Sequence, residues 1–367
     1  MPELFLTIFF ISILLFFLGT GIWVALSMVG VSAIGMLLFT SRPVGDAMAT
    51  TIWGTSSSWT LTALPLFVWM GEILFRTKLS ENLFKGLAPW MSRLPGGLIH
   101  VNIVGCALFA AISGSSAATV ATVGKMSIPE LRKRNYPEKL LLGSLAGSGT
   151  LGLLIPPSII LIIYGVTVQE SIAKLFIAGI IPGIMIAIFF MFYVIGWSIL
   201  NKDIMPQTKE TFSFSQKIKD SGQLIPVIVL ITAVIGSIYV GIATATEAAS
   251  LGVVGALILS FFQKSLNKET FKLSLLGATK TSCMIAFILA GSSFLSLAMG
   301  FTGLPRNLAI WIQEMNLSPY VLILVLTIFY IILGMFLDGI SAVVLTMAII
   351  EPMIRQAGFD MIWFGVF

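Results

Sequence analysis

Long apolar segments follow one another along the whole chain. Clear examples span residues 22–40, 172–200, 224–239, 248–262 and 320–336. Their lengths approach the roughly 20 residues that an α-helix needs to cross about 30 Å of hydrocarbon. They do not show the ten-residue alternation of a membrane β-barrel. Because a backbone in lipid must satisfy its own hydrogen bonds, this pattern predicts an all-α polytopic membrane protein.

The composition agrees with a surface that faces lipid. Of the 367 residues, 57% are hydrophobic and only 10% are charged. A soluble domain carries about 25% charged residues, because water must wet its surface. The formal net charge of +5 is modest, and the basic residues concentrate in a few loops, as membrane orientation requires. We therefore expect a lipid bilayer around the chain and no nucleic acid as a partner.

Other kinds of protein are excluded by what the sequence lacks. The first apolar stretch has no basic n-region and no signal-peptide cleavage site, so we expect a retained helix. Cys106 and Cys283 lie far apart, and the chain has one His, which excludes a disulfide framework and a zinc site. No nucleophile–base pair or phosphate-binding loop is recognisable, so a membrane enzyme is not predicted.

The chain resembles itself weakly at an offset of about 225 residues. The segment 113–117 aligns with 338–342. Residues 29–30 align with 254–255 in the same register. A single match between apolar segments means little, but a common register over most of the chain predicts two related halves.

The charges of two loops in the first half place both loops on the same side of the membrane. Residues 76–96 and 125–139 are strongly basic, so both are expected in the cytoplasm. The segment between them then enters and leaves on one side. This predicts a re-entrant hairpin at about 98–128, bent at Ser113-Gly114-Ser115-Ser116.

The second half shows the opposite distribution of charge. Its loops at 302–318 and 351–360 lack a basic excess and fit the outside. The loops at 201–222 and 263–280 hold four lysines each and fit the cytoplasm. Two similar halves with opposite loop charge indicate an inverted-topology repeat, the usual architecture of secondary transporters. A second re-entrant hairpin is expected at about 319–350.

The repeat predicts the domain organisation. Residues 1–200 form the first repeat, with scaffold helices, the first hairpin and a broken helix at about 140–165. Residues 201–222 form a cytoplasmic linker, and residues 223–367 form the second repeat. The second repeat ends before a counterpart of the broken helix. It is therefore either incomplete or cut short where the sequence stops.

The bend of the first hairpin offers oxygen ligands. Ser113, Gly114, Ser115 and Ser116 lie deep in an apolar segment. Glycine and serine permit a non-helical backbone, whose carbonyls, with the hydroxyls, are hard ligands suited to an alkali cation. The same small residues also suit close helix packing in membranes. Both interpretations stay open, and the predicted hairpin favours the cation site.

The next apolar segment is interrupted twice, at Gly149-Thr150 and at Pro156-Pro157-Ser158. A Pro-Pro pair removes two amide donors and disfavours helix before it, which leaves carbonyls unpaired. A simple kink is one interpretation. A discontinuous helix facing the hairpin bend is the other, and we favour it because irregular backbone at membrane depth is tolerated where it lines a wet cavity.

Asp338 occupies the bend of the second hairpin, followed by Gly339 and Ser341. A buried carboxylate is unfavourable by several kcal/mol unless it is paired, protonated or coordinated. No Lys or Arg lies nearby in the sequence. The carboxylate is expected either to cap exposed backbone amides or to serve a cation or a substrate hydroxyl.

Three other titratable residues have simpler explanations. Glu72 lies four residues before Arg76, which predicts an ion pair at a helix end. Glu247 follows Thr244 at a predicted helix start, where capping suffices. His100 is expected at the membrane interface rather than in a proton relay.

Four segments together resemble the large membrane subunit of tripartite ATP-independent periplasmic (TRAP) transporters. They are Ala-Ala-Ile-Ser-Gly-Ser-Ser-Ala at 110–117, Gly-Leu-Leu-Ile-Pro-Pro-Ser at 152–158, Leu-Phe-Ile-Ala-Gly-Ile-Ile-Pro-Gly at 175–183 and Gly-Met-Phe-Leu-Asp at 334–338. The resemblance covers essentially the whole chain. The family's pattern continues past residue 367 with a second Pro-Pro element.

The resemblance implies sodium-driven uptake of an organic acid by an elevator motion in a bacterial inner membrane. It implies two partners, a small membrane subunit and a periplasmic substrate-binding protein. C4-dicarboxylates, 2-oxo acids and sialic acids all suit the family. A stand-alone ion-coupled anion transporter and a channel are the alternatives, and an inverted repeat with broken helices favours alternating access over the channel.

The expected site lies between the two bends and the interrupted backbone. Without a Lys or Arg near either bend, bound Na⁺ and helix N-termini would supply the positive field for a carboxylate. The expected Na⁺ ligands are Ser113, Gly114, Ser115, Ser116, Gly149, Thr150, Pro156, Asp338, Gly339 and Ser341. The expected substrate contacts are Ser116, Pro157, Ser158 and Asp338.

Overall fold

The fold is built from helices throughout the residues that the structure describes. The computed structural model describes residues 2–77, 79–206, 213–303, 305, 307, 310, 318–335 and 337–367. Every regular element in these ranges is helical, so the all-α prediction is confirmed for them. The predicted outside loop at 302–318 lies largely outside the described residues, as does part of the linker at 201–222.

The helices have the length and surface of a membrane protein. Within the described ranges, five helices are long and apolar enough to cross a membrane, or up to seven if each of two bent pairs counts as one span. Large apolar side chains lie on the surface, including Leu200, Tyr320 and Ile242, each at least 80% exposed. In water this exposure would be unfavourable by about 25 cal/mol per Å², whereas lipid tails accept it. The chain is a multi-pass membrane protein.

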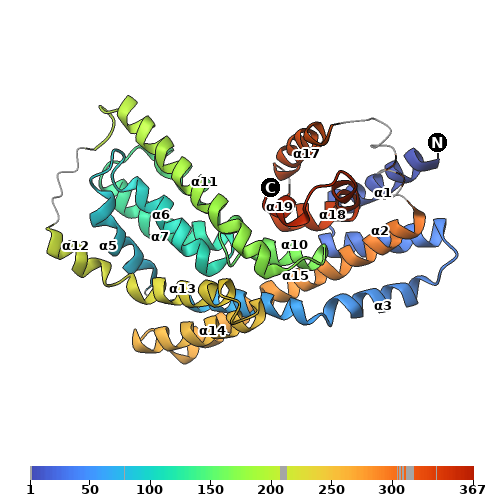
Figure 1. Cartoon of the computed structure of the whole chain (residues 1–367), viewed down its shortest axis with the longest axis horizontal. Helices are drawn as coiled ribbons and strands as arrows, with labels where there is room; N and C mark the ends of the chain where they lie inside the picture. The colour runs from blue at the N-terminus through green and yellow to red at the C-terminus, as the bar shows by residue number, and fades with distance from the viewer. Residues whose placement is uncertain are drawn as a thin grey trace.

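One group of helices lies along the lower part of Figure 1 and includes the longest helix, α15. Its 35 residues span roughly 52 Å, and it contacts α2, α3 and α4 along its length. The helices of this group are α2 (Val24–Phe39), α3 (Val44–Ser56), η1 (Trp59–Thr62), α4 (Ala63–Phe75), α13 (Ile225–Tyr239), α14 (Ala245–Phe262) and α15 (Lys268–Thr302), with α1 (Pro2–Gly19) packed on α2.

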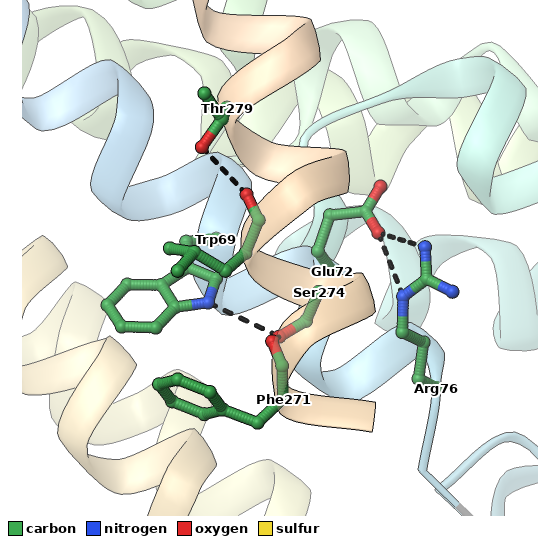
Figure 2. Close-up of polar contacts among 7 residues, drawn as sticks. Trp69, Glu72, Arg76, Phe271, Ser274 and Thr279 are labelled. Atoms are coloured by element: carbon green, nitrogen blue, oxygen red, sulfur yellow. Dashed lines mark hydrogen bonds and ion pairs between the residues drawn. The ribbon is translucent and has the colours of Figure 1, made fainter. Parts of the chain in front are cut away.

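The crossing of α4 and α15 combines a hydrogen bond with aromatic packing (Figure 2). The indole Nε1 of Trp69 donates to the Ser274 hydroxyl over 3.3 Å. The ring of Trp69 meets that of Phe271 edge-on, with centroids 5.8 Å apart. An edge-to-face pair stabilises packing by about 0.5–1.5 kcal/mol beyond the area it buries. These contacts hold two helices together that lie about 200 residues apart in sequence.

The ion pair expected for Glu72 and the helix cap expected for Glu247 are both confirmed. Arg76 donates to Glu72 over 2.9 Å, as Figure 2 also shows. Thr244 and Glu247 form a complete capping box at the start of α14. The side chain of His100 is fully buried within the protein, and its Nε2 lies 2.7 Å from the Pro95 carbonyl. Its expected position at the membrane interface stays a prediction.

The second group of helices contains both predicted hairpins. In Figure 1, α6 and α7 lie at one end of the molecule and α17 to α19 at the other, with α10 and α11 between them. The long helix α11 contacts α6, α8, α9, α10 and α19. The helices of this group are α6 (Ile99–Ser113), α7 (Ser116–Lys133), α8 (Glu138–Gly149), α9 (Leu151–Leu154), α10 (Ile159–Thr167), α11 (Ile172–Leu200), α17 (Pro319–Gly334), α18 (Gly339–Gln356) and α19 (Met361–Val366).

Two short amphipathic helices connect the two groups at the end of the molecule where α6 and α7 lie (Figure 1). They are α5 (Leu79–Met91) and α12 (Phe214–Ser221), which pack on each other. The indole of Trp90 donates to the Ser221 hydroxyl over 2.7 Å. The ammonium of Lys217 lies 5.2 Å from the centre of the same ring, a favourable cation–π distance.

Polar side chains mark where the helices around the site begin. Ser115, Ser158 and Asp338 are the N-caps of α7, α10 and α18, and each side chain accepts a hydrogen bond from a backbone amide. A cap of this kind stabilises a helix by about 1 kcal/mol because the first amides have no partner within the helix. At the two bends and at the break between α9 and α10, a capping side chain therefore fixes where the next helix begins.

Candidate functional site

The first hairpin turns sharply at Gly114. This residue ends α6 in the left-handed region, with φ +59°, and its amide donates to the Ala110 carbonyl over 3.0 Å. The Ser113 hydroxyl lies 3.0 Å from the Thr119 hydroxyl and donates to the Ser115 carbonyl over 3.3 Å. Hydroxyl groups thus order the bend within a segment that is otherwise apolar.

The broken helix is interrupted between Leu154, the end of α9, and Ile159, the start of α10. The bond between Pro156 and Pro157 is cis. Across the gap, the Ser158 hydroxyl donates to the Leu153 carbonyl and accepts from the Leu161 amide. One side chain therefore bridges the two helix ends.

The first bend and the interruption are in direct contact. The Ile159 amide donates to the Gly114 carbonyl over 3.1 Å, which joins segments about 45 residues apart. A Cβ at Gly114 would lie 2.5 Å from the Pro157 carbonyl oxygen. A Cβ at Gly152 would lie 2.9 Å from the Ser116 nitrogen. The two backbones approach so closely that both positions require glycine.

The interruption leaves backbone carbonyls without hydrogen bonds. No donor in the described part of the chain reaches the carbonyl oxygens of Ile155, Pro156 or Pro157. Pro156 and Pro157 are buried, and more than 90% of buried backbone polar groups in proteins have a partner. Three consecutive carbonyls in this state form a set of hard oxygen donors that fits a cation or a polar ligand.

Helix α11 supports the interruption from behind. A Cβ at Gly179 would lie 2.7 Å from the Leu154 carbonyl oxygen, and one at Gly183 would lie 2.7 Å from Cγ1 of Ile155. The absence of side chains at these positions lets the broken backbone lie directly on α11. This contact gives a physical reason for the two glycines in the segment 175–183.

The second bend approaches the same interruption through different contacts. A Cβ at Gly339 would lie 2.9 Å from Cδ1 of Ile160 and 3.8 Å from Cδ1 of Leu153, residues on either side of the break. Oδ2 of Asp338 accepts from the amides of Ile340 and Ser341, over 3.1 and 3.2 Å. The capping role is therefore present. The expected burial of this carboxylate is wrong, because Asp338 is exposed at the start of α18, and its Oδ1 has no donor among the residues described.

The predicted residues are not all placed alike. Ser116 is half-buried, and its hydroxyl has no partner in the described ranges. Ser341 is 3% exposed at the start of α18. Gly149 is buried, and a side chain there would meet Val120 of α7. Thr150 is exposed and its hydroxyl donates to the Gly147 carbonyl over 2.7 Å, so this side chain is engaged within its own helix end.

Three glycines to which sequence reasoning gave no role shape the site. A Cβ at Gly71 of α4 would lie 3.0 Å from the Ser113 Cα, which brings the first helix group against the first bend. Gly152 and Gly179 allow the contacts described above, and both lie in segments that carry the family resemblance. The only sequence signal of Gly71 is a glycine inside an apolar helix, which many packing contacts share.

We expect Gly114→Ala to destabilise the protein strongly. The left-handed backbone alone disfavours a Cβ by about 1–2 kcal/mol, and the added methyl would meet the Pro157 carbonyl. The matched control is Gly143→Ala in α8, where no atom lies within 4 Å of the added Cβ and helix propensity favours alanine. Thermal unfolding in detergent should show a lower midpoint for the first variant only. Equal midpoints would contradict the close approach.

Comparison with known proteins identifies the family. The family model described as "Tripartite ATP-independent periplasmic transporter, DctM component" matches residues 9–367. The C4-dicarboxylate TRAP transporter large permease protein DctM of Pseudomonas aeruginosa is 31% identical over 337 residues, 91% of this chain and 78% of the relative. Its counterpart in Rhodobacter capsulatus is 29% identical, over 95% of this chain and 81% of the relative.

A third relative is named for a different substrate. The 2,3-diketo-L-gulonate TRAP transporter large permease protein YiaN of Escherichia coli is 31% identical, over 87% of this chain and 75% of the relative. The family match extends over both hairpins and the broken helix between them. The chain therefore belongs to the family of large permease subunits of tripartite ATP-independent periplasmic (TRAP) transporters.

Proposed function

We propose that this chain moves an organic acid across a bacterial inner membrane by sodium-coupled alternating access of the elevator type. The observation that carries the proposal is that both bends approach one interrupted helix, whose carbonyls are unpaired. Relatives named for C4-dicarboxylates and for 2,3-diketo-L-gulonate support a small organic anion as the substrate.

The family supports two partners for this subunit. They are a small membrane subunit and a periplasmic binding protein that delivers the acid. Family membership does not favour a stand-alone exchanger or a channel. Proteoliposomes that hold this chain should take up labelled acid only when both partners and a Na⁺ gradient are present. Saturable uptake without the partners would instead support the stand-alone exchanger.

The order of the helices supports an inverted repeat. The α6–α7 and α17–α18 pairs are both helix–turn–helix units, and they lie about 225 residues apart. The first arms, α6 and α17, have 15 and 16 residues. At 1.5 Å per residue these arms reach roughly 22–24 Å, less than the roughly 30 Å of hydrocarbon. The second arms, α7 and α18, have 18 residues each, or roughly 27 Å, and α18 is one of the five helices long and apolar enough to span. The short first arms therefore carry the proposal of hairpins that enter and leave on one side.

The elevator proposal assigns different roles to the two helix groups. The group of α2–α4 and α13–α15 would remain fixed, and the group of α6–α11 and α17–α19 would move with the site. Helices α10 and α11 support this division, because α10 contacts α18 and α11 contacts α6. The contacts of α4 with α6 and of α15 with α18 would form the sliding surface.

The hairpin proposal predicts which side of the membrane labels the two loops. Single cysteines near residues 80 and 135 should both react with an impermeant thiol reagent added from the cytoplasmic side. The exposed Cys283 must first be replaced, whereas Cys106 is buried. If the two positions label from opposite sides, the segment between them spans the membrane and the inverted repeat fails.

The two bend hydroxyls predict different effects when they are removed, one on sodium dependence and one on stability. Because the Ser116 hydroxyl has no described partner, Ser116→Ala should raise the Na⁺ concentration for half-maximal uptake severalfold and leave the unfolding midpoint nearly unchanged. Ser113→Ala removes hydrogen bonds to Thr119 and Ser115 and should lower the midpoint by the equivalent of about 1 kcal/mol. Unchanged sodium dependence in Ser116→Ala would assign this serine to packing.

Asp338→Asn separates the capping role of this side chain from its charge. Asparagine caps helices as well as aspartate does, so the variant should keep its free energy of unfolding within about 0.5 kcal/mol of the parent value. If the charge serves a cation or a substrate hydroxyl, uptake at limiting Na⁺ should fall at least tenfold. Near-normal uptake would leave Asp338 with the observed cap alone.

A further inference from the structure

A large cleft opens beside the first hairpin, between segments that carry many basic residues. It has a volume of about 1130 Å³ and lies between the end of α4, helix α5, helix α7 and residues of α12. Helix α7 contributes Thr122, Lys125, Met126, Pro129 and Glu130. This spacing of three and four residues corresponds to one continuous face of the helix.

The same face of α7 leads from the cleft to the first bend. Toward its N-terminus the stripe continues through Thr119 to Ser115, which are joined by a hydrogen bond of 2.7 Å. Thr122, the innermost lining residue of α7, lies six residues from Ser116, or roughly 9 Å along the helix axis. Thr122 and Thr119 are buried, at 4% and 0% exposure, so in this structure the cleft is closed toward the bend and ends less than two helical turns from it.

Positive charge predominates on the cleft wall. Its charged residues are Arg76, Lys85, Lys125 and Arg134, with Glu130 and Asp220. Arg76 is paired with Glu72 and Arg134 with Glu130, over 2.9 and 2.8 Å. Lys85 and Lys125 face the cleft from α5 and α7, are exposed, and have no ion pair in the ranges that the structure describes. Asp220 is the one lining carboxylate of those ranges without such a pair.

We propose that this cleft is the passage by which a small organic anion leaves the site for the cytoplasm, with Lys85 and Lys125 supplying the positive potential that attracts it. The inference rests on the proposed transport function and adds the route and the residues. Clefts with charge of one sign and low-dielectric walls raise the local concentration of the opposite ion. The two lysines line the cleft from two helices, α5 and α7, and attract the anion over a distance rather than by contact at the bends.

The passage is tested by the charge selectivity of a cysteine placed inside it. Met126→Cys is made with Cys283→Ser, and inside-out vesicles react with an anionic sulfonate or a cationic ammonium methanethiosulfonate. Each rate is divided by that of a free thiol in solution. We expect the anionic reagent to be favoured by about threefold or more at low salt, and less at 0.5 M salt because screening is stronger.

Lys85→Gln with Lys125→Gln should lower this ratio to one or below, because Asp220 is then the unpaired charge of the described lining. Lys139→Gln removes the same charge from an exposed position outside the cleft and should leave the ratio unchanged. A ratio near one in the parent, no response to the double variant, or no reaction with either reagent would each overturn the passage.

This measurement does not depend on transport. If the ratio behaves as expected while the assembled system takes up no acid, the transport proposal fails and the anion-attracting cleft remains. If uptake is normal and the ratio shows no preference, the cleft proposal fails alone.

Discussion

The interrupted backbone at residues 155–158 is the constraint on which the surrounding structure depends. A membrane interior has no water to satisfy free carbonyls, so such a segment persists only where protein covers it or where it lines a polar cavity. Here α11 covers one side through Gly179 and Gly183, and the first bend covers another through Gly114. Close approach of backbones, more than side-chain packing, holds this region together.

Two segments from different halves of the chain therefore share one support. The first bend contacts the interruption by a hydrogen bond, whereas the second contacts it by apolar packing at Gly339. In the proposed mechanism this difference matters. A backbone hydrogen bond fixes one side of the oxygen donors, and an apolar contact, which has no preferred direction, leaves the other side able to shift as ligands bind.

Electrostatics divides the proposed route into two parts. Around the bends and the interruption, the donors are carbonyls, hydroxyls and one carboxylate, so an anion there depends on a cation for its stability. At Lys125, roughly 13.5 Å along α7 from Ser116, the cleft instead carries an exposed lysine side chain, with Lys85 facing the cleft from α5. An anion that leaves a site built this way passes from one source of positive potential to another. Strong binding by an arginine within the site would hinder such release.

The sequence by itself determined most of the apolar helices and the family, although it assigned to loops the residues of α5 and the first turns of α15. Apolar length gives the spans, Ser115, Ser158 and Asp338 begin helices by local capping, and the Glu72–Arg76 and Thr244–Glu247 pairs follow from spacing of three or four residues. These effects act within one or two helical turns, so they can be predicted from neighbouring residues.

Only the tertiary structure decided which interruptions meet, that neighbouring helices bury His100, and that lysines of α5 and α7 face one cleft. Such contacts join segments 40 or more residues apart. The residues next to a glycine or a lysine in the sequence do not show which distant segment it contacts.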